Sequence, residues 1–378
     1  MVERDQPGGE PRFFMLETIR EFARELLAGS DEAHAIHDSH SRCFALLADQ
    51  DAERLTADEK AAWFERLDQE SANLSAALDW AIARADIQLG IPLILALCEI
   101  QWNRVRTIEA QSQIAAVLSW LDLSAQPAKH IRLLQWAFAF ARIQGDFDGA
   151  RALGLQALEI ARAMGEPNQV ASTLSLLGDL AYREGDNAAA RRLLEEALAI
   201  QRGRGKPAEL ASTLLSLAMT LYLDGELDQA QVPIKEDIDI QRDIGPTAEL
   251  GSALQPYAWI LTDQGQFTAA RDCLREARSV FERVHMGTGL LWTVEGTARL
   301  AAARGEAELA VRLAGATRSL RQTMHVPLPQ SIQLDFDHHL ATCREQLGET
   351  AFRAAWDDGA HLTYEEATAE ASAYLDRT

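Results

Sequence analysis

Two histidine-containing clusters are the best candidates for metal chemistry in the sequence. His34, His37 and His40 stand at intervals of three in HAIHDSHSRCF, and histidines one helical turn apart can share a metal ion. His40, however, lies about 240° around a helix from His34, so the three rings do not face one ion. In QLDFDHHL, Asp335 and His338 are also one turn apart, a spacing typical of charge pairs on helix surfaces. We therefore expect no metal site.

Nucleophilic and phosphate-binding motifs are missing from the sequence. There is no G-x-S-x-G elbow, and none of the lysines stands in a G-x-x-x-x-G-K-[ST] loop. The four cysteines are at least 55 residues apart and show no C-x-x-C spacing, which predicts neither a disulfide framework nor a zinc knuckle. The sequence thus predicts a chain that is not an enzyme, with no catalytic residue and no cofactor.

The amino-acid composition limits the kinds of partner that the chain is expected to bind. The 378 residues include 57 acidic and 36 basic side chains, and the net charge of −21 would repel a phosphate backbone, so we expect no direct nucleic-acid binding. No apolar run reaches the roughly 18 residues that cross a bilayer, and the start MVERDQPGGEPR lacks the pattern of a signal peptide. We expect a cytoplasmic chain with no membrane association.

The strongest pattern is a repeat of 40 residues. Glycines stand on this grid at Gly145, Gly185, Gly225, Gly265 and Gly305, and an alanine follows each after five residues. Ala110 extends the grid one unit upstream, where Val105 replaces the glycine. The grid predicts six units, from about residue 85 to 324, and a period of this length indicates a repeat architecture.

The sequence pattern of each unit predicts two amphipathic helices separated by the glycine. Apolar residues follow helical spacing on both sides of Gly185, as in Leu174, Leu177, Leu194 and Leu198. Glycine supplies the left-handed conformation that ends the first helix, and the alanine lets the paired helices approach closely. Because one pair cannot bury its apolar face alone, neighbouring pairs must stack into a solenoid.

The unit around Gly185 resembles the tetratricopeptide repeat in a long form. The flanking strings resemble bacterial STAND-type ATPase regulators of the MalT-like, AfsR-like and LuxR-type groups. These strings are RFFMLETIREFARELL at 12–27, WFERLDQESANLSAALDWAIARAD at 63–86, and LAGATRSLRQTMHVPLPQ followed by LGETAFRAAWDDGAHLTYEEATAEA near the end. The ATPase and DNA-binding modules of that family have no counterpart here, so no ATP site is carried over.

The resemblance implies a fold and a domain order. We expect an all-α, right-handed tetratricopeptide-like α-solenoid of about six 40-residue helical pairs, with helical segments before and after it. The expected divisions are a mobile N-terminus at 1–11, a winged-helix remnant and helical adaptor at 12–84, the repeats at 85–324, and a C-terminal helical cap at 325–378.

Family geometry also implies a concave binding face, lined by residues of the first helices. Counting back from each glycine gives Arg132, Gln135, Arg142, Asp179, Tyr182, Arg183, Met219, Tyr222, Gln255, Trp259, Trp292, Glu295 and Arg299. Aromatic and arginine side chains are favoured at binding hot spots. Two alternatives stay open: Trp259 or Trp292 fills a core between repeats, and the arginines pair with neighbouring acidic groups instead of forming a positive pocket for an anionic ligand or acidic peptide.

These observations favour a non-enzymatic binding module. Its expected partner is a protein segment or a small-molecule inducer on the concave face, and it would serve as the sensor or scaffold arm of a STAND-type transcriptional regulator. The alternative is a free-standing tetratricopeptide scaffold or assembly protein without a sensing role, for which a second copy of the chain is a candidate partner.

Overall fold

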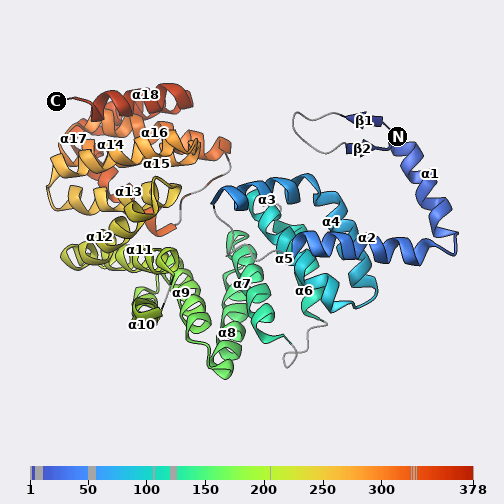
Figure 1. The fold of residues 1–378 in the computed structure, drawn as a ribbon. Helices are drawn as coiled ribbons and strands as arrows, with labels where there is room; N and C mark the ends of the chain where they lie inside the picture. Colours follow the sequence, from blue (N-terminus) through green and yellow to red (C-terminus); the bar gives the residue numbers. More distant parts are fainter. Residues whose placement is uncertain are drawn as a thin grey trace. The chain divides into compact units, whose positions relative to one another are not determined.

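The computed structural model describes residues 2–4, 12–49, 57–104, 107–119, 126–204, 206–324, 326, 328 and 330–377. The chain divides into two compact units, Met1–Ala157 and Leu158–Thr378, and each is described by itself. Most of the described residues lie in helices (Figure 1), which confirms the predicted all-α fold class. No helix in these ranges is long and apolar enough to cross a membrane.

The first unit begins with a short antiparallel hairpin. Strand β1 (Val2–Arg4) pairs with strand β2 (Arg12–Phe14), with Val2 opposite Phe14. These two strands add to the predicted helical fold, and the aromatic pair Phe13 and Phe14 suits a strand. The predicted mobile segment 1–11 falls largely on residues 1 and 5–11, which lie outside the described residues.

Four helices follow the hairpin: α1 (Glu17–Ala28), α2 (Ala33–Ala48), α3 (Ala57–Gln69) and α4 (Ser71–Ala83). Helices α2 and α4 pack against α5, the first helix of the repeats, around fully buried side chains such as Leu74, Leu78 and Ile94. Trp63 of α3 donates its indole N–H to the carbonyl of Leu47 at 3.2 Å. The apolar faces of these helices thus build one core.

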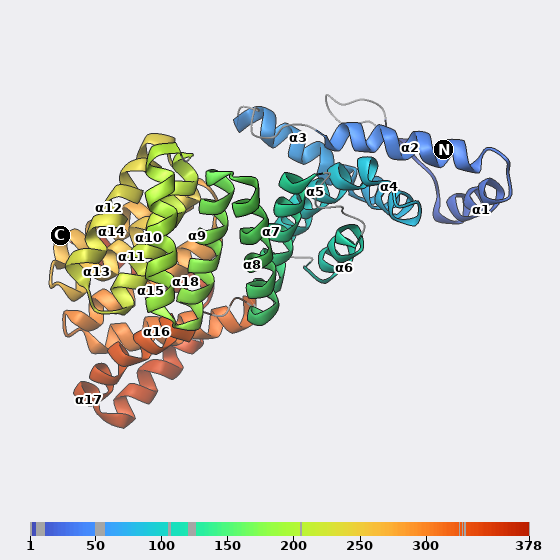
Figure 2. The ribbon, with the colours of Figure 1, turned by 90° about the horizontal axis from the view of Figure 1, so that it is seen from below.

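Helices α5 to α16 form six successive pairs in the described ranges, as the grid predicted. Their bounds are α5 (Ile87–Arg104), α6 (Thr107–Leu118), α7 (Pro127–Ile143), α8 (Phe147–Met164), α9 (Pro167–Glu184), α10 (Asn187–Arg204), α11 (Pro207–Leu223), α12 (Leu227–Ile244), α13 (Ala248–Asp263), α14 (Phe267–Arg283), α15 (Gly287–Ala303) and α16 (Ala307–Met324). In the second unit each helix packs on the next from α9 to α16, and Figure 2 shows them side by side.

The grid glycines end the first helix of each pair in the predicted conformation. All five have a left-handed φ, between 73° and 82°. At Gly185 the amide donates to the carbonyl of Tyr182 at 3.1 Å, and the amide of Asp186 donates to Ala181 at 2.9 Å. This bonding satisfies carbonyls that the helix end would leave unpaired. A side chain at these positions would strain the backbone.

The grid alanines lie where paired helices touch. Ala150, Ala190, Ala230, Ala270 and Ala310 are all fully buried, which confirms the close approach expected there. Ala110 and Val105 lie outside the residues whose side chains are described.

The second helices of the second unit carry an ionic ladder on the same period. Arg162 pairs with Glu196 at 3.1 Å, Arg202 with Glu236 at 2.8 Å, and Arg242 with Glu276 at 2.8 Å. These side chains are about half exposed, so each pair stabilises the fold by at most about 1 kcal/mol.

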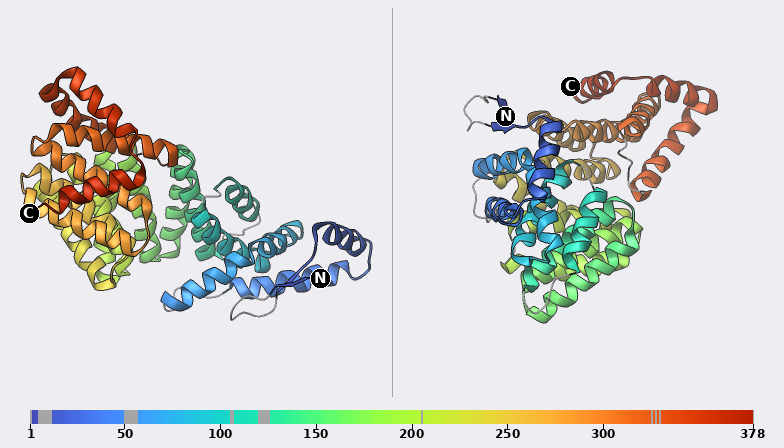
Figure 3. Two further views of the ribbon diagram at one scale, coloured as in Figure 1. Left: turned by 90° about the horizontal axis from the view of Figure 1, so that it is seen from above. Right: turned by 90° about the vertical axis from the view of Figure 1, so that its right-hand side faces the viewer.

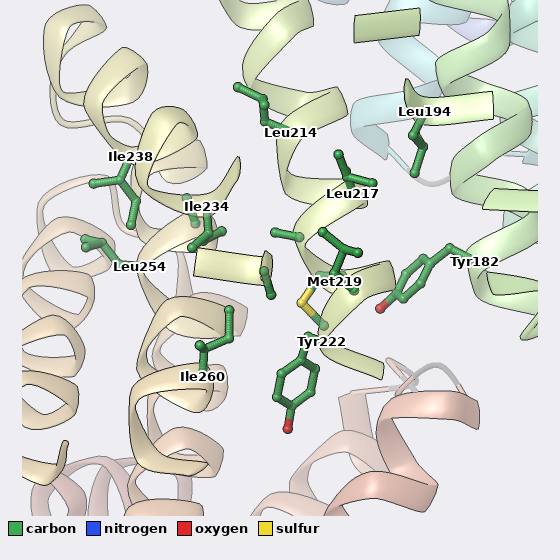
Figure 4. Packing of buried hydrophobic residues seen from close by; sticks show 14 of the residues in the cluster. Tyr182, Leu194, Leu214, Leu217, Met219, Tyr222, Ile234, Ile238, Leu254 and Ile260 are labelled. Carbon is green, nitrogen blue, oxygen red and sulfur yellow. The ribbon is translucent and has the colours of Figure 1, made fainter. Parts of the chain in front are cut away.

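One hydrophobic core cluster of the second unit lies between the repeats. It is built from residues of α9 to α14, among them the aliphatic Leu194, Leu214, Ile234 and Leu254. Figure 4 shows Tyr222 at the edge of this cluster, with its hydroxyl pointing away from the aliphatic side chains.

The second unit closes with α17 (Gln330–Ala360) and α18 (Tyr364–Leu375). Gly348, with φ 76° and ψ 160°, interrupts α17 and divides it into a front half and a rear half. Phe352 and Ala355 of the rear half are buried in a cluster with residues of α16. Helix α18 packs across α14, α15 and α16, as Figure 3 (left) shows in dark red. These contacts cover the apolar face that a terminal repeat would otherwise expose.

Candidate functional site

Ten of the predicted binding residues belong to the second unit, and we call them the inner strip. They lie on the first helices of four successive pairs, α9, α11, α13 and α15: Asp179, Tyr182, Arg183, Met219, Tyr222, Gln255, Trp259, Trp292, Glu295 and Arg299. The other three, Arg132, Gln135 and Arg142, lie on α7 in the first unit and are considered separately.

Arg299 is the centre of the inner strip. Its side chain is only 2% exposed, and its guanidinium binds Asp263, at the end of α13, at 2.9 Å. It also pairs with Asp335 and contacts His339, both on the front half of α17, and donates to the hydroxyl of Tyr222. We call these five residues the Arg299 cluster.

Aromatic rings complete the surroundings of Arg299. The guanidinium carbon lies 5.4 Å from the ring centre of Tyr222 and 5.7 Å from that of Trp259. The Tyr222 hydroxyl donates to Asp263 at 3.0 Å, and it lies 3.2 Å from the nearer carboxylate oxygen of Asp335. The guanidinium is therefore held by charge, by hydrogen bonds and by cation–π contacts together.

The electrostatics of the cluster favour a charged arginine and a neutral histidine. Burial opposes the charge on Arg299, but Tyr222, Asp335 and Asp263 outweigh burial, so the pKa of Arg299 is raised. Burial, reinforced by the charge of Arg299, lowers the pKa of His339. A neutral His339 ring nitrogen can accept the hydrogen bond that Arg299 offers.

A second buried ion pair lies one turn away on α15. Glu295 is 4% exposed, and both of its carboxylate oxygens accept from Arg321 of α16. Arg321 also donates to the carbonyl of Val326 at 3.0 Å. Burial raises the pKa of Glu295, although Arg321 works against the shift. This pair ties α15 to α16 and to the chain that leads into α17.

The apolar members of the inner strip belong to the core as well as to the surface. Tyr182 and Met219 are buried, whereas Trp259 and Trp292 are partly buried and pack against the same cluster. Gln255 donates to the carbonyl of Trp292 at 2.6 Å. Both tryptophans therefore do fill space between repeats, while keeping part of their surface open.

At the other end of the strip, Arg183 pairs within its own helix. It lies 2.8 Å from Asp179 one turn earlier on α9, and both side chains are partly exposed. This agrees with the expectation that some arginines pair with acidic neighbours.

A segment from outside the repeats lies along the inner strip. We call residues 326–340 the occupying segment; it is described at Val326, at Leu328 and from residue 330 onward. Leu328 and the buried Ile332 pack against the core cluster of the repeats, and α17 contacts α9 as well as α15 and α16. Leu334 on the opposite side of the helix is 63% exposed. One face of this segment thus covers the inner strip.

A cavity of about 550 Å³ separates the occupying segment from part of α16. Its walls include Leu328, Phe336 and Leu340 of the segment, Arg318 of α16, and Trp356. The segment therefore contacts both the inner strip and α16, where Leu340 is buried with Val311 and Ala314, and the cavity interrupts only its contact with α16.

In the first unit, Arg132 is half exposed and lies 4.0 Å from Glu99, while Gln135 and Arg142 are partly buried. These three residues belong to the first unit and the inner strip to the second, so a binding face that they share stays a prediction.

The side chains of the two histidine-containing clusters pack against or pair with other residues of the fold. His37 stacks on Trp80 at 4.6 Å, and His34 meets the same ring edge-on at 5.3 Å. Within the described ranges no group of three or more His, Cys, Asp or Glu side chains could hold a metal ion. Asp335, which the sequence paired with His338, binds Arg299 instead.

Sequence reasoning missed the roles of three residues in the Arg299 cluster. Asp263 stands two residues before its glycine, the same place that Arg183 takes in an earlier repeat, so consistent counting would have found it. His339 and Asp335 lie beyond the grid, and no periodic signal indicated that their segment folds back onto the repeats.

Comparison with known proteins identifies the repeats. A family model described as "Tetratricopeptide repeat" matches residues 131–203, and another with the same description matches residues 258–285. The chain therefore contains tetratricopeptide repeats, as the resemblance implied.

Curated relatives from Mycobacterium tuberculosis (strain H37Rv) and Mycobacterium bovis are provisionally named HTH-type transcriptional regulators. Each is 30% identical over 198 residues, a region that covers 47% of this chain and 21% of the relative. The chain thus spans about a fifth of the length of these relatives.

Two solved structures are similar to this chain. A Rap protein complexed with Competence and Sporulation Factor is 13% identical, with a TM-score of 0.52, over 82% of this chain and 94% of that protein. BtubC from P. vanneervenii is 20% identical, with a TM-score of 0.48, over 60% of this chain and 94% of its own. At such identities the Rap protein supports the fold and nothing further.

Proposed function

We propose that the inner strip of the second unit binds a segment of a partner protein. The observation that carries this proposal is the pairing of Arg299 with Asp335, since a segment from outside the repeats already lies there as a bound segment would. A nearly buried guanidinium flanked by two aromatic rings has the composition of a binding hot spot. The Rap protein with a similar fold was solved in complex with Competence and Sporulation Factor, so a chain of this fold can hold a separate factor.

The wider role we propose is that of the sensor or scaffold arm of a STAND-type transcriptional regulator. The flanking strings and the relatives named as HTH-type regulators support it. In such a regulator, nucleotide-driven switching and DNA binding would reside in other modules, and the arm would bias the switch when its partner binds. We place this non-catalytic function in the cytoplasm, in keeping with the widely separated cysteines.

The proposal is tested by selecting partners without assuming their sequence. Phage-displayed random 16-residue peptides are selected on the full chain and on its Asp335→Ala variant, and the selected peptides are titrated against Trp259→Ala. We expect Trp259→Ala to weaken binding at least tenfold while the variant remains folded, which circular dichroism at 222 nm verifies. Arg202→Ala, on the ionic ladder, serves as the control and should leave binding unchanged.

The alternative of a free-standing scaffold predicts a different outcome. Static light scattering would then show an oligomer that grows with concentration, and no selected peptide would depend on Trp259. Peptides that bind all variants equally would place binding outside the inner strip and contradict the proposal.

A further inference from the structure

The occupying segment shows which chemistry the inner strip accepts. Ile332, Asp335, Phe336 and His339 follow helical spacing and lie on one face of the front half of α17. Ile332 packs into the core cluster, Asp335 binds Arg299, and His339 contacts the same guanidinium. Asp337 and His338, between them, are exposed. The inner strip therefore contacts an aliphatic side chain and, three positions later in the same helix, a carboxylate.

The carboxylate is the most demanding of these requirements. Asp335 supplies the acceptor for Nη1 of Arg299, while Asp263 accepts from Nη2. A guanidinium that is 2% exposed cannot replace a lost partner with water at no cost. Any segment that takes the place of Asp335 has to bring an acceptor for Nη1, and a carboxylate also matches its charge.

The way the occupying segment is held allows its replacement. Gly348 breaks α17 behind the segment, and Phe352 and Ala355 of the rear half pack against the last repeat in a cluster of buried residues that only Leu340, at the end of the segment, shares. The cavity of about 550 Å³ leaves part of the segment without packing against α16. Its front half can thus leave the inner strip while the rear half continues to cap the solenoid.

We propose that the inner strip selects partner helices carrying an aliphatic residue and, three positions later, a carboxylate, and that such a helix displaces the occupying segment. This inference rests on the proposed function and specifies its partner. The occupying segment competes at the high effective concentration of a tethered ligand, so free helices bind the wild-type chain only weakly.

The test uses the segment itself as the probe. A fluorescein-labelled synthetic peptide of residues 328–342 is titrated against the full wild-type chain, and binding is measured by fluorescence anisotropy. The same titration uses a full-length Ile332→Ser/Asp335→Ser variant, in which the occupying segment binds the inner strip more weakly. We expect the variant to bind the peptide at least tenfold more tightly than wild type. The same peptide with Asp335→Asn should bind the variant about tenfold more weakly, because the amide keeps the shape but loses the charge.

A further change on the protein locates the binding. Adding Arg299→Met to the variant should make it bind the Asp and Asn peptides alike, and Arg299→Lys should restore part of the preference. Circular dichroism at 222 nm verifies that each protein is folded. The Asp-to-Asn comparison changes only the peptide, so it stays decisive even where an Arg299 variant fails to fold.

Three results would overturn the inference: a folded Ser/Ser variant that does not bind the peptide, equal binding by wild type and variant, or equal binding of the Asp and Asn peptides. Each can occur while the library selection still returns peptides that depend on Trp259. Peptides of that kind without a carboxylate would uphold the proposed function and refute this choice of partner. A selection that returns no Trp259-dependent peptide would refute both.

Discussion

Asp237 on α12 occupies the position that Ala197 holds forty residues earlier in the preceding repeat. Ala197 is fully buried, and Asp237 is 1% exposed. Neither carboxylate oxygen of Asp237 makes a hydrogen bond of good geometry to any described residue. Burial raises the pKa of Asp237 to about 7, although Gln241 offsets part of the shift. A carboxylate thus stands where the repeat otherwise places a methyl group.

The first prediction is that Asp237→Ala stabilises the protein, and more so at higher pH. Between its unfolded pKa near 4 and its folded pKa near 7, Asp237 binds a proton only in the folded state, so its contribution to stability falls as the pH rises through this window. At about 1.4 kcal/mol per pKa unit, the gain in unfolding free energy should be about 2 kcal/mol larger at pH 8 than at pH 5.5. Urea unfolding at both pH values measures it.

Asp239→Ala is the matched control for this prediction. Asp239 lies on the same helix with a side chain that is 79% exposed. Its removal should change stability by less than about 0.5 kcal/mol at either pH. A gain for Asp237→Ala that is equal at both pH values would mean that its carboxylate does not titrate in this window.

The repeats were predictable because their determinants are local and recur. Each grid glycine ends a helix through its own left-handed φ, and each grid alanine contacts the partner helix a few residues away in the chain. The same grid holds the clue to Asp237, since it shares a register with Ala197 and Ala277. Periodicity predicts which positions touch, and here it did so for the five pairs from α7 to α16.

The Arg299 cluster could be predicted only in part. Counting back from Gly305 placed Arg299 on the inner strip, because that position depends on the repeat alone. The pairing with Asp335 depends on where α17 turns after the last repeat, and no spacing encodes that turn. The short separation of Asp335 and His338 instead suggested a local pair, which a long-range contact of Asp335 with Arg299 replaced.

The second prediction concerns the crossing of α16 with the rear half of α17. A Cβ at Gly359 would overlap the backbone carbonyl of Arg312, and a Cβ at Gly315 would overlap that of Trp356. Neither helix can make room by a side-chain rotation alone, because the obstacle is backbone. Gly359→Ala should therefore lower the unfolding free energy by about 1–3 kcal/mol, which urea unfolding would measure.

Gly203→Ala is the matched control, and we expect it to raise the unfolding free energy in the same experiment. Gly203 lies in the last turn of α10, and a Cβ there would meet nothing within 4 Å. Alanine restricts the unfolded chain more than glycine does, so this variant should gain about 0.4–1 kcal/mol. If Gly359→Ala behaved like Gly203→Ala, the two helices would not approach as closely as the structure shows.

The third prediction concerns the buried pair of Glu295 and Arg321. Replacing one partner leaves the other charge without its counterion in the protein interior, so Arg321→Met alone or Glu295→Met alone should cost about 3–5 kcal/mol. The double variant removes both charges and should recover most of that loss. Part of it should remain, because Arg321 also donates to the carbonyl of Val326.

A double-mutant cycle from urea unfolding separates these contributions. A double variant as unstable as the sum of the singles would show that the two side chains act independently, which their hydrogen-bonded geometry does not permit. The loss of stability that remains in the double variant measures the hydrogen bond from Arg321 to the carbonyl of Val326, which connects α16 to the chain leading into α17. If that bond helps to hold the occupying segment, Arg321→Met/Glu295→Met should also bind the 328–342 peptide more tightly than wild type.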